Sequence, residues 1–203
     1  MNDTEFQIII SIVTLFSIFF LIFLFKALYW RSHIETPEKR AGRMGERFVS
    51  ELIYETLHKD DELLTNVHIY ADDKQTELDN VIINGNGVFI IEAKNYHGEL
   101  FGNEDDSEWI KNKITPSGSI YQTTVNNPIK QVKRQIYILS TLLRDNGIDA
   151  WIEGYIFFVE RNSPVSSEFV LETQSDIDGA IHTASKKMLS KKTQDEIISL
   201  LRK

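Results

Sequence analysis

Three charged side chains stand at the ends of two apolar segments that a glycine-rich turn connects. Asp79 comes just before residues 81–83, whereas Glu92 and Lys94 follow residues 88–91. Apolar, β-branched runs on either side of an Asn/Gly turn are typical of a β-hairpin. The chemistry available at the open end of such a hairpin is that of two carboxylates and one amine.

The hairpin geometry predicts that these charges meet. Pairing that is symmetric about the turn places Val81 opposite Ile90 and Asp79 opposite Glu92. Like charges directly opposite each other destabilise a sheet, so two carboxylates there favour a bound cation. Lys94 lies two residues beyond Glu92, and its side chain therefore leaves the same face of the strand.

A solvated pair of charges at a strand end is the alternative interpretation, and such a pair contributes little. Both faces of the hairpin are apolar, however, which is typical of central strands that other elements cover. Charges at the rim of a covered sheet occupy the position where α/β proteins place their sites, although this is an analogy.

Two predicted helices can cover the hairpin and add polar groups to its open end. Residues 39–57 carry apolar residues at helical spacing, with Glu46 on the flank of that stripe. Asn127-Pro128 is a helix start, and Gln131 follows one turn later. The order helix, strand, hairpin, helix, strand and terminal helices predicts a three-layer α/β fold with a central sheet between helices.

The N-terminus predicts a membrane location. Residues 8–30 are almost entirely apolar, long enough for one transmembrane helix through a lipid bilayer. Basic residues follow this segment and none precedes it, which predicts an outside N-terminus and a cytoplasmic C-terminal domain. We therefore expect an anchor over 1–31, a linker over 32–38 and a cytoplasmic domain over 39–203, at the cell membrane.

The overall charge limits how nucleic acid could bind. The formal net charge is −8, which excludes binding by bulk electrostatics. A basic helical face made of Lys130, Lys133 and Arg134 is the best candidate for phosphate contacts. The chain has no cysteine and no histidine pair near the hairpin in sequence, which argues against a zinc site there.

An ordered set of motifs resembles a known family, the NERD (nuclease-related) domain. The motifs, in chain order, are Gly42-x-x-Gly45-Glu46, Glu77-Leu78-Asp79, Gly87-Val88-Phe89-Ile90-Ile91-Glu92-Ala93-Lys94-Asn95-Tyr96-x-Gly98, Trp109 and Asn127-Pro128-x-x-Gln131. The resemblance covers about residues 41–159 and implies the PD-(D/E)XK, restriction-endonuclease-like fold. Leu78 stands where the superfamily name has proline.

The resemblance also implies roles for individual residues. Asp79 and Glu92 would bind a divalent metal, Mg²⁺ or Mn²⁺, together with the backbone carbonyl of Ala93. Lys94 would orient the attacking water, while Glu46 and Gln131 would face the same site. Oxygen ligands of this kind suit Mg²⁺, which can act as a Lewis acid and activate water.

Two functions remain open from the sequence. The first is a membrane-anchored, divalent-metal-dependent nuclease that hydrolyses phosphodiester bonds, with DNA as the expected nucleic-acid partner. The alternative is a catalytically silent, membrane-tethered module with the same fold that binds nucleic acid or signals.

Overall fold

The computed structural model describes residues 2–33, 35–114, 118–161, 163–183 and 188–202. The chain divides into two compact units, residues 1–40 and 41–203. The first contains helix α1 (Asp3–His33), and helix α2 (Pro37–Thr56) begins before the second.

Helix α1 carries the segment that the sequence assigns to a bilayer. Within it, the side chains of residues 3–6, 8–10, 27–28 and 31–33 lie outside the described part of the structure. Among the residues that are described, no helix is both long enough and apolar enough to cross a membrane. The transmembrane helix expected over residues 8–30, and the lipid bilayer as its partner, are therefore not supported by the structure.

A five-stranded mixed sheet forms the centre of the second unit. The strand order is β1-β2-β3-β7-β8, with antiparallel pairs on the β1 side of β3 and parallel pairs beyond it. The strands are β1 (Glu62–Ala71), β2 (Lys74–Asn84), β3 (Gly87–Lys94), β7 (Ile152–Phe158) and β8 (Val170–Leu171). Strand β3 lies between β2 and β7, and all its residues except Lys94 are buried.

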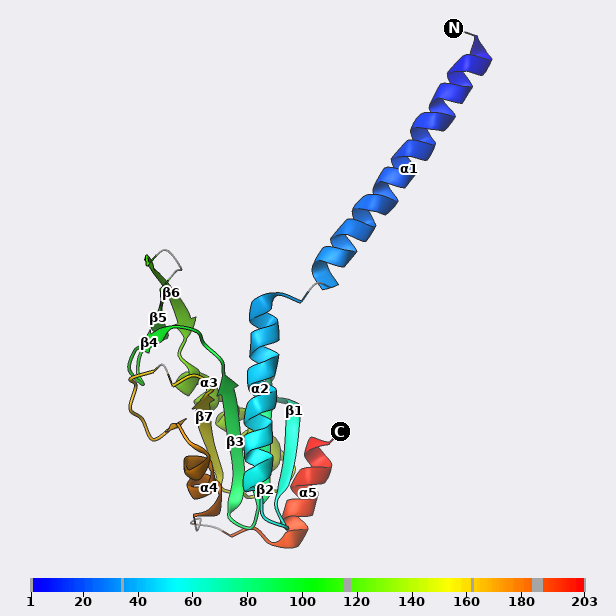
Figure 1. Ribbon diagram of the computed structural model, residues 1–203. Helices are drawn as coiled ribbons and strands as arrows, with labels where there is room; N and C mark the ends of the chain where they lie inside the picture. Colours follow the sequence, from blue (N-terminus) through cyan, green and yellow to red (C-terminus); the bar gives the residue numbers. More distant parts are fainter. Residues whose placement is uncertain (1, 34, 115–117, 162, 184–187, 203) are drawn as a thin grey trace. The chain divides into compact units, whose positions relative to one another are not determined.

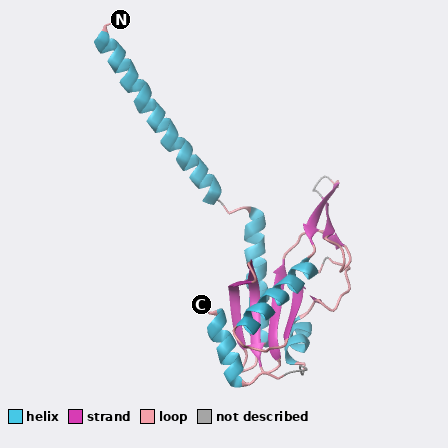
Figure 2. Ribbon diagram, turned by 180° about the vertical axis from the view of Figure 1, so that it is seen from behind, coloured by secondary structure: helices cyan, strands magenta, loops and turns pink. Residues whose placement is uncertain are grey.

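Helices cover both faces of this sheet. Phe89 and Ile91 pack with α2 and with α4 (Gln174–His182), whereas Val88 and Ile90 pack with α3 (Pro128–Asp145) and α5 (Lys191–Leu201). Alternation of side chains along β3 sends successive residues to opposite faces. Figure 1 shows α2 along one face of the sheet, and the reverse view in Figure 2 shows α3 crossing the other. The predicted three-layer α/β architecture, with a central sheet between helices, is confirmed.

Local signals in the sequence explain where the helices begin and end. The Asn127 side chain accepts a hydrogen bond from the Ile129 amide, and Pro128 occupies the first turn, as predicted. Gly147, with φ of +73°, follows the end of α3. The N-cap of α5 is Ser190, whose hydroxyl accepts from the Thr193 amide at 3.1 Å.

A separate three-stranded sheet follows the C-terminal end of β3. It consists of β4 (Glu99–Phe101), β5 (Glu108–Ile114) and β6 (Ile120–Asn126). Leu100 and Trp109 anchor it against Ile129 and Phe158, so it packs beside the start of α3 and the end of β7. Asn127 also donates to the backbone carbonyls of Asn103, Glu104 and Asp106, which fixes the β4–β5 loop.

The register of the central hairpin agrees with the sequence up to its last pair. Asn84 pairs with Gly87 and Val81 with Ile90, as symmetric pairing about the turn predicts. The ladder ends at Asn80 and Ile91, one pair short of Asp79 and Glu92. The backbone pair that would place these two carboxylates directly opposite each other is therefore not part of the ladder.

Candidate active site

Glu92 is the centre of the candidate site because it is a buried carboxylate near the end of a central strand. Its side chain is 3 % exposed, and it leaves β3 on the face that α3 covers. A buried carboxylate needs hydrogen bonds to offset the loss of water. Three side chains supply them: Lys94 and Gln131 donate to Oε1, and Gln135 donates to Oε2 at 2.7 Å.

Lys94 forms a tight ion pair with Glu92 inside the protein. Its Nζ lies 2.6 Å from Oε1, and its side chain is 16 % exposed. Burial alone would lower the pKa of Lys94, but the charge of Glu92, with smaller contributions from Tyr96 and Asp79, raises it overall. The amine therefore stays protonated and supplies a fixed positive charge at the rim of the sheet.

Asp79 ends the β2–β3 ladder by accepting a backbone hydrogen bond with its side chain. The Ala93 amide donates to Asp79 Oδ2 at 2.9 Å. Burial and then the charge of Glu92 raise the pKa of Asp79 to about 7, against the opposing effects of the Ala93 amide and Lys94. The positive charge of Lys94 and the Ala93 amide therefore only partly offset the effects of burial and of Glu92 on Asp79.

Glu46 approaches the same groups from α2. Its pKa is raised by burial and by the charges of Glu77 and Glu92. The close approach of α2 depends on Gly45, since a Cβ there would lie 2.7 Å from the Cβ of Asn95. Asn95, directly after β3, donates to the Ala41 carbonyl at 2.8 Å and ties the helix to the strand.

Gln135 is a site residue that the sequence analysis did not assign. Its Nε2 donates to Glu92 and, at 3.0 Å, to the Glu77 carbonyl, while its Oε1 is buried without a hydrogen-bond partner among the described residues. The sequence feature that could have identified Gln135 is its position one helical turn after Gln131, on the same stripe of α3.

The residues present fit a divalent cation. Two carboxylates and a buried amide oxygen without a partner are oxygen donors of the type that Mg²⁺ and Mn²⁺ prefer. Burial first, and then neighbouring carboxylates, raise the pKa values of Asp79 and Glu46, and a bound cation would oppose both effects. Ligation by the Ala93 carbonyl stays a prediction.

The three basic residues expected to bind phosphate contact the chain itself. Lys130 donates to the Asp105 carbonyl at 2.7 Å, and Arg134 donates to the Gln75 carbonyl at 3.2 Å. Lys133 lies 3.6 Å from Glu104 and over the ring of Phe169. In the structure these side chains therefore hold the β4–β5 loop and the start of β2.

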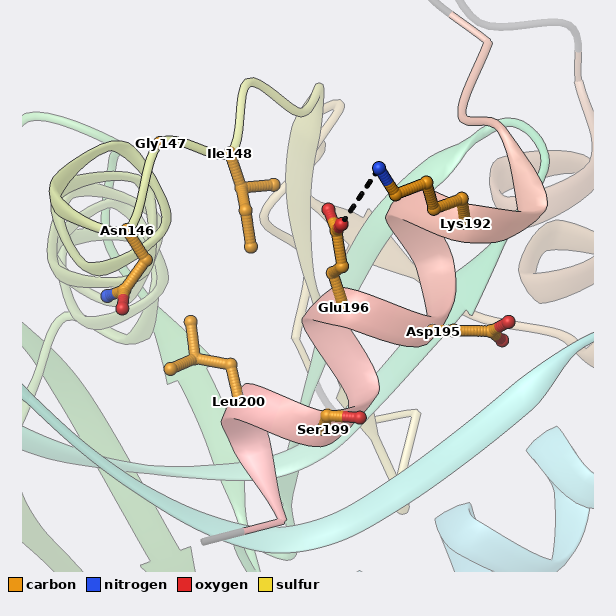
Figure 3. A pocket seen from close by; sticks show the side chains of 8 residues that line it. All are labelled: Asn146, Gly147, Ile148, Lys192, Asp195, Glu196, Ser199 and Leu200. Atoms are coloured by element: carbon orange, nitrogen blue, oxygen red, sulfur yellow. Dashed lines mark ion pairs between the residues drawn. The ribbon is translucent and has the colours of Figure 1, made fainter.

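A cavity of about 830 Å³ lies elsewhere, between the loop after α3 and helix α5. Figure 3 shows that its ion pair, Lys192 with Glu196 at 3.7 Å, comes from neighbouring turns of one helix. Those side chains are 87 % and 49 % exposed, unlike the buried pair of Glu92 and Lys94. Size alone does not make this cavity a reactive site.

Comparison with known proteins agrees with the motifs. An uncharacterized protein of Bacillus anthracis is 30% identical over 96 residues, which cover 47% of this chain and 45% of that protein. The chain thus spans about half the length of this relative, and no solved structure gives a significant match. The sequence profile of the nuclease-related domain (NERD) matches residues 41–159, which contain every residue of the candidate site. The chain belongs to the NERD family, within the restriction-endonuclease-like superfamily.

Proposed function

We propose that this protein is a divalent-metal-dependent nuclease that hydrolyses phosphodiester bonds in DNA. The observation that carries the proposal is the buried Glu92, held by Lys94, Gln131 and Gln135 beside an Asp79 whose pKa is about 7. Family membership adds a nuclease-related function to this geometry.

Asp79 and Glu92 would hold the cation, Mg²⁺ or Mn²⁺, with Glu46 and the Ala93 carbonyl as further oxygen donors. When bound, such an ion polarises the phosphoryl oxygen and lowers the pKa of a bound water. The unpartnered Oε1 of Gln135 gives one more oxygen near the carboxylates.

The side chains of the chain itself supply positioning and charge. Lys94, protonated and fixed by Glu92, would orient the attacking water and offset the negative charge that builds on the phosphate. Gln131 and Gln135 hold Glu92 in one orientation, so that little reorganisation is needed during the reaction.

Lys130, Lys133 and Arg134 are proposed as phosphate contacts beside the site. Two of them donate to backbone carbonyls, and phosphate oxygens are stronger acceptors. A DNA backbone would therefore compete for these donors. Substitution of each should weaken DNA binding and reduce its dependence on salt.

A cleavage assay with the full chain tests the proposal. Plasmid DNA, linear DNA and RNA are incubated with Mg²⁺ or Mn²⁺, and EDTA should abolish cleavage. Glu92→Gln and Lys94→Met should each lower the rate at least about 100-fold. The exposed pair on α5 gives matched controls, because Glu196→Gln and Lys192→Met change the same chemistry far from the site.

The two functions predict different results in this assay. Cleavage that survives Glu92→Gln and Lys94→Met would contradict the proposed site. Binding of DNA that resists EDTA, without cleavage under either metal, would favour the catalytically silent module. Cleavage of RNA but not DNA would correct the substrate class.

We further propose a location at the cell membrane, with the N-terminus outside and residues 39–203 in the cytoplasm. The large apolar side chains from Ile12 to Phe25 are all exposed, and such a surface needs a partner in water. Alkaline carbonate extraction of membranes tests this, followed by protease protection. Release of the protein into the soluble fraction would contradict it.

A further inference from the structure

A second cluster of ligand-type side chains lies at the other end of the central hairpin. His182, at the end of α4, contacts Asp61 through Nε2 at 2.8 Å and Asp178 through Nδ1 at 2.6 Å. The ring of His58 stacks on that of His182, with 3.7 Å between the ring centroids. His58 and Asp61 come from the loop between α2 and β1.

The fold fixes this cluster firmly. The hairpin turn holds the end of α4, because Asn84 and Asn86 both donate to the Ile181 carbonyl, at 3.0 and 3.2 Å. Asp61 also accepts from the His58 amide at 2.7 Å, which closes the α2–β1 loop. The side chains of Asp61 and His182 are only 7 % and 14 % exposed.

We propose that His58, Asp61 and His182 form a second metal site, which takes a transition-metal ion of the Zn²⁺ type. One ligand atom from each of the three residues lies within 4.8 Å of the others, and no other such group of three occurs among the described residues. Two imidazoles and one carboxylate suit Zn²⁺ and leave its fourth position for water.

Asp178 is not one of the three proposed ligands, but it contacts the ligand His182. Histidines that bind metals commonly donate their second ring N–H to a carboxylate, which fixes the ring and its tautomer. Asp178 Oδ1 occupies that position at Nδ1 of His182, leaving Nε2 directed toward Asp61. Binding at Nε2 releases the proton shared with Asp61 to solvent, and the stacked His58 ring must tilt to direct a nitrogen at the ion.

This cluster is distinct from the candidate active site. Asp79, Glu92 and Lys94 lie just beyond the last pair of the β2–β3 ladder, whereas Asn84 and Asn86 lie at the turn. Along α2, Glu46 and the last residue, Thr56, are separated by about 15 Å. The ion would connect the α2–β1 loop to α4 across more than half of the sequence, so its binding should stabilise the folded chain.

Metal binding by the full chain tests the inference. After treatment with EDTA and its removal, the protein is titrated with Co²⁺, whose visible absorption reports tetrahedral coordination, and with Zn²⁺. The wild type should bind one Co²⁺ per chain at this site, displaced by Zn²⁺, and Zn²⁺ should raise its Tm. Asp79→Asn should leave this binding unchanged.

Histidine variants locate the site. His58→Ala and His182→Ala should each abolish the Co²⁺ spectrum. His97→Ala should not, although His97 also contacts a carboxylate, that of Glu160. Because His58 is exposed, its variant keeps the test valid if His182→Ala does not fold. Absence of stoichiometric Co²⁺ binding, or a spectrum that persists in both variants, would overturn the proposal and leave a hydrogen-bonded cluster only.

Discussion

The two ends of the β2–β3 hairpin offer different donor atoms. At the open end the strands separate, and the carboxylates of Asp79 and Glu92 lie beside a lysine and two glutamines. At the turn, Asn84 and Asn86 bind the end of α4 and thereby place His182 beside Asp61. One hairpin therefore presents an oxygen-rich site suited to hard cations and a mixed nitrogen and oxygen site suited to softer ones.

The polar groups at the two ends of the hairpin also differ in their electrostatic environment. Raised pKa values at the open end come from burial and from neighbouring negative charge. At the turn, Asn84 is neutral and donates to a carbonyl. We therefore expect substitutions at the open end to affect activity and those at the turn to affect stability.

A pair of buried amides gives the largest expected contrast. Gln135→Leu removes a donor from Glu92 and should lower activity about 10- to 100-fold, the range found for residues that orient metal ligands. Asn84→Ala leaves the Ile181 carbonyl with one donor fewer and should cost about 1 to 2 kcal/mol of stability. Cleavage rates per folded protein and urea unfolding measure the two effects. Equal activity loss in both variants would remove the distinction between the ends.

Two glycines on α2 test how the helix places Glu46. Gly45→Ala should destabilise the protein by about 1 to 3 kcal/mol, because its Cβ would lie 2.7 Å from Asn95. Gly42→Ala is the matched control, since a Cβ there meets only the Glu46 carboxylate, at 4.0 Å. That change should be neutral or stabilise α2 by up to about 1 kcal/mol. Urea unfolding of both variants measures this difference, and equal stabilities would contradict the close approach of α2.

The raised pKa of Asp79 should also make the stability of the protein depend on pH. Asp79 has a pKa of about 7 in the folded protein and an ordinary value of 3.8, so between these values only the folded state keeps the proton. Without divalent cations, the free energy of unfolding should therefore fall as the pH rises through this interval. Asp79→Asn should flatten the profile and make the protein more stable than the wild type above pH 7. An unchanged slope in denaturation curves would contradict this prediction.

The sequence predicted the elements that depend on local signals. The Asn/Gly turn and the apolar runs around it determined the register of β2 and β3, and Asn127-Pro128 determined the start of α3. Glu92, Lys94 and Gln131 meet because strand alternation and helical spacing are regular.

The features that could not be predicted from the sequence lie where regular secondary structure ends or where distant segments meet. Symmetric pairing continued the ladder to Asp79 and Glu92, but the Asp79 side chain replaces a backbone acceptor for the Ala93 amide. The expected phosphate contacts, Lys130 and Arg134, bind carbonyls that only the folded chain brings near. The histidine cluster has no local signal, because His58 and His182 come from separate elements.

The most direct test of the account is Mn²⁺ binding, followed by electron paramagnetic resonance, in the wild type, Asp79→Asn and His182→Ala. Mn²⁺ prefers oxygen ligands and binds weakly to imidazole sites compared with Zn²⁺. We predict that the wild type and His182→Ala bind Mn²⁺ alike, whereas Asp79→Asn loses it. Mn²⁺ binding by Asp79→Asn with wild-type affinity would contradict a cation site at the open end of the hairpin.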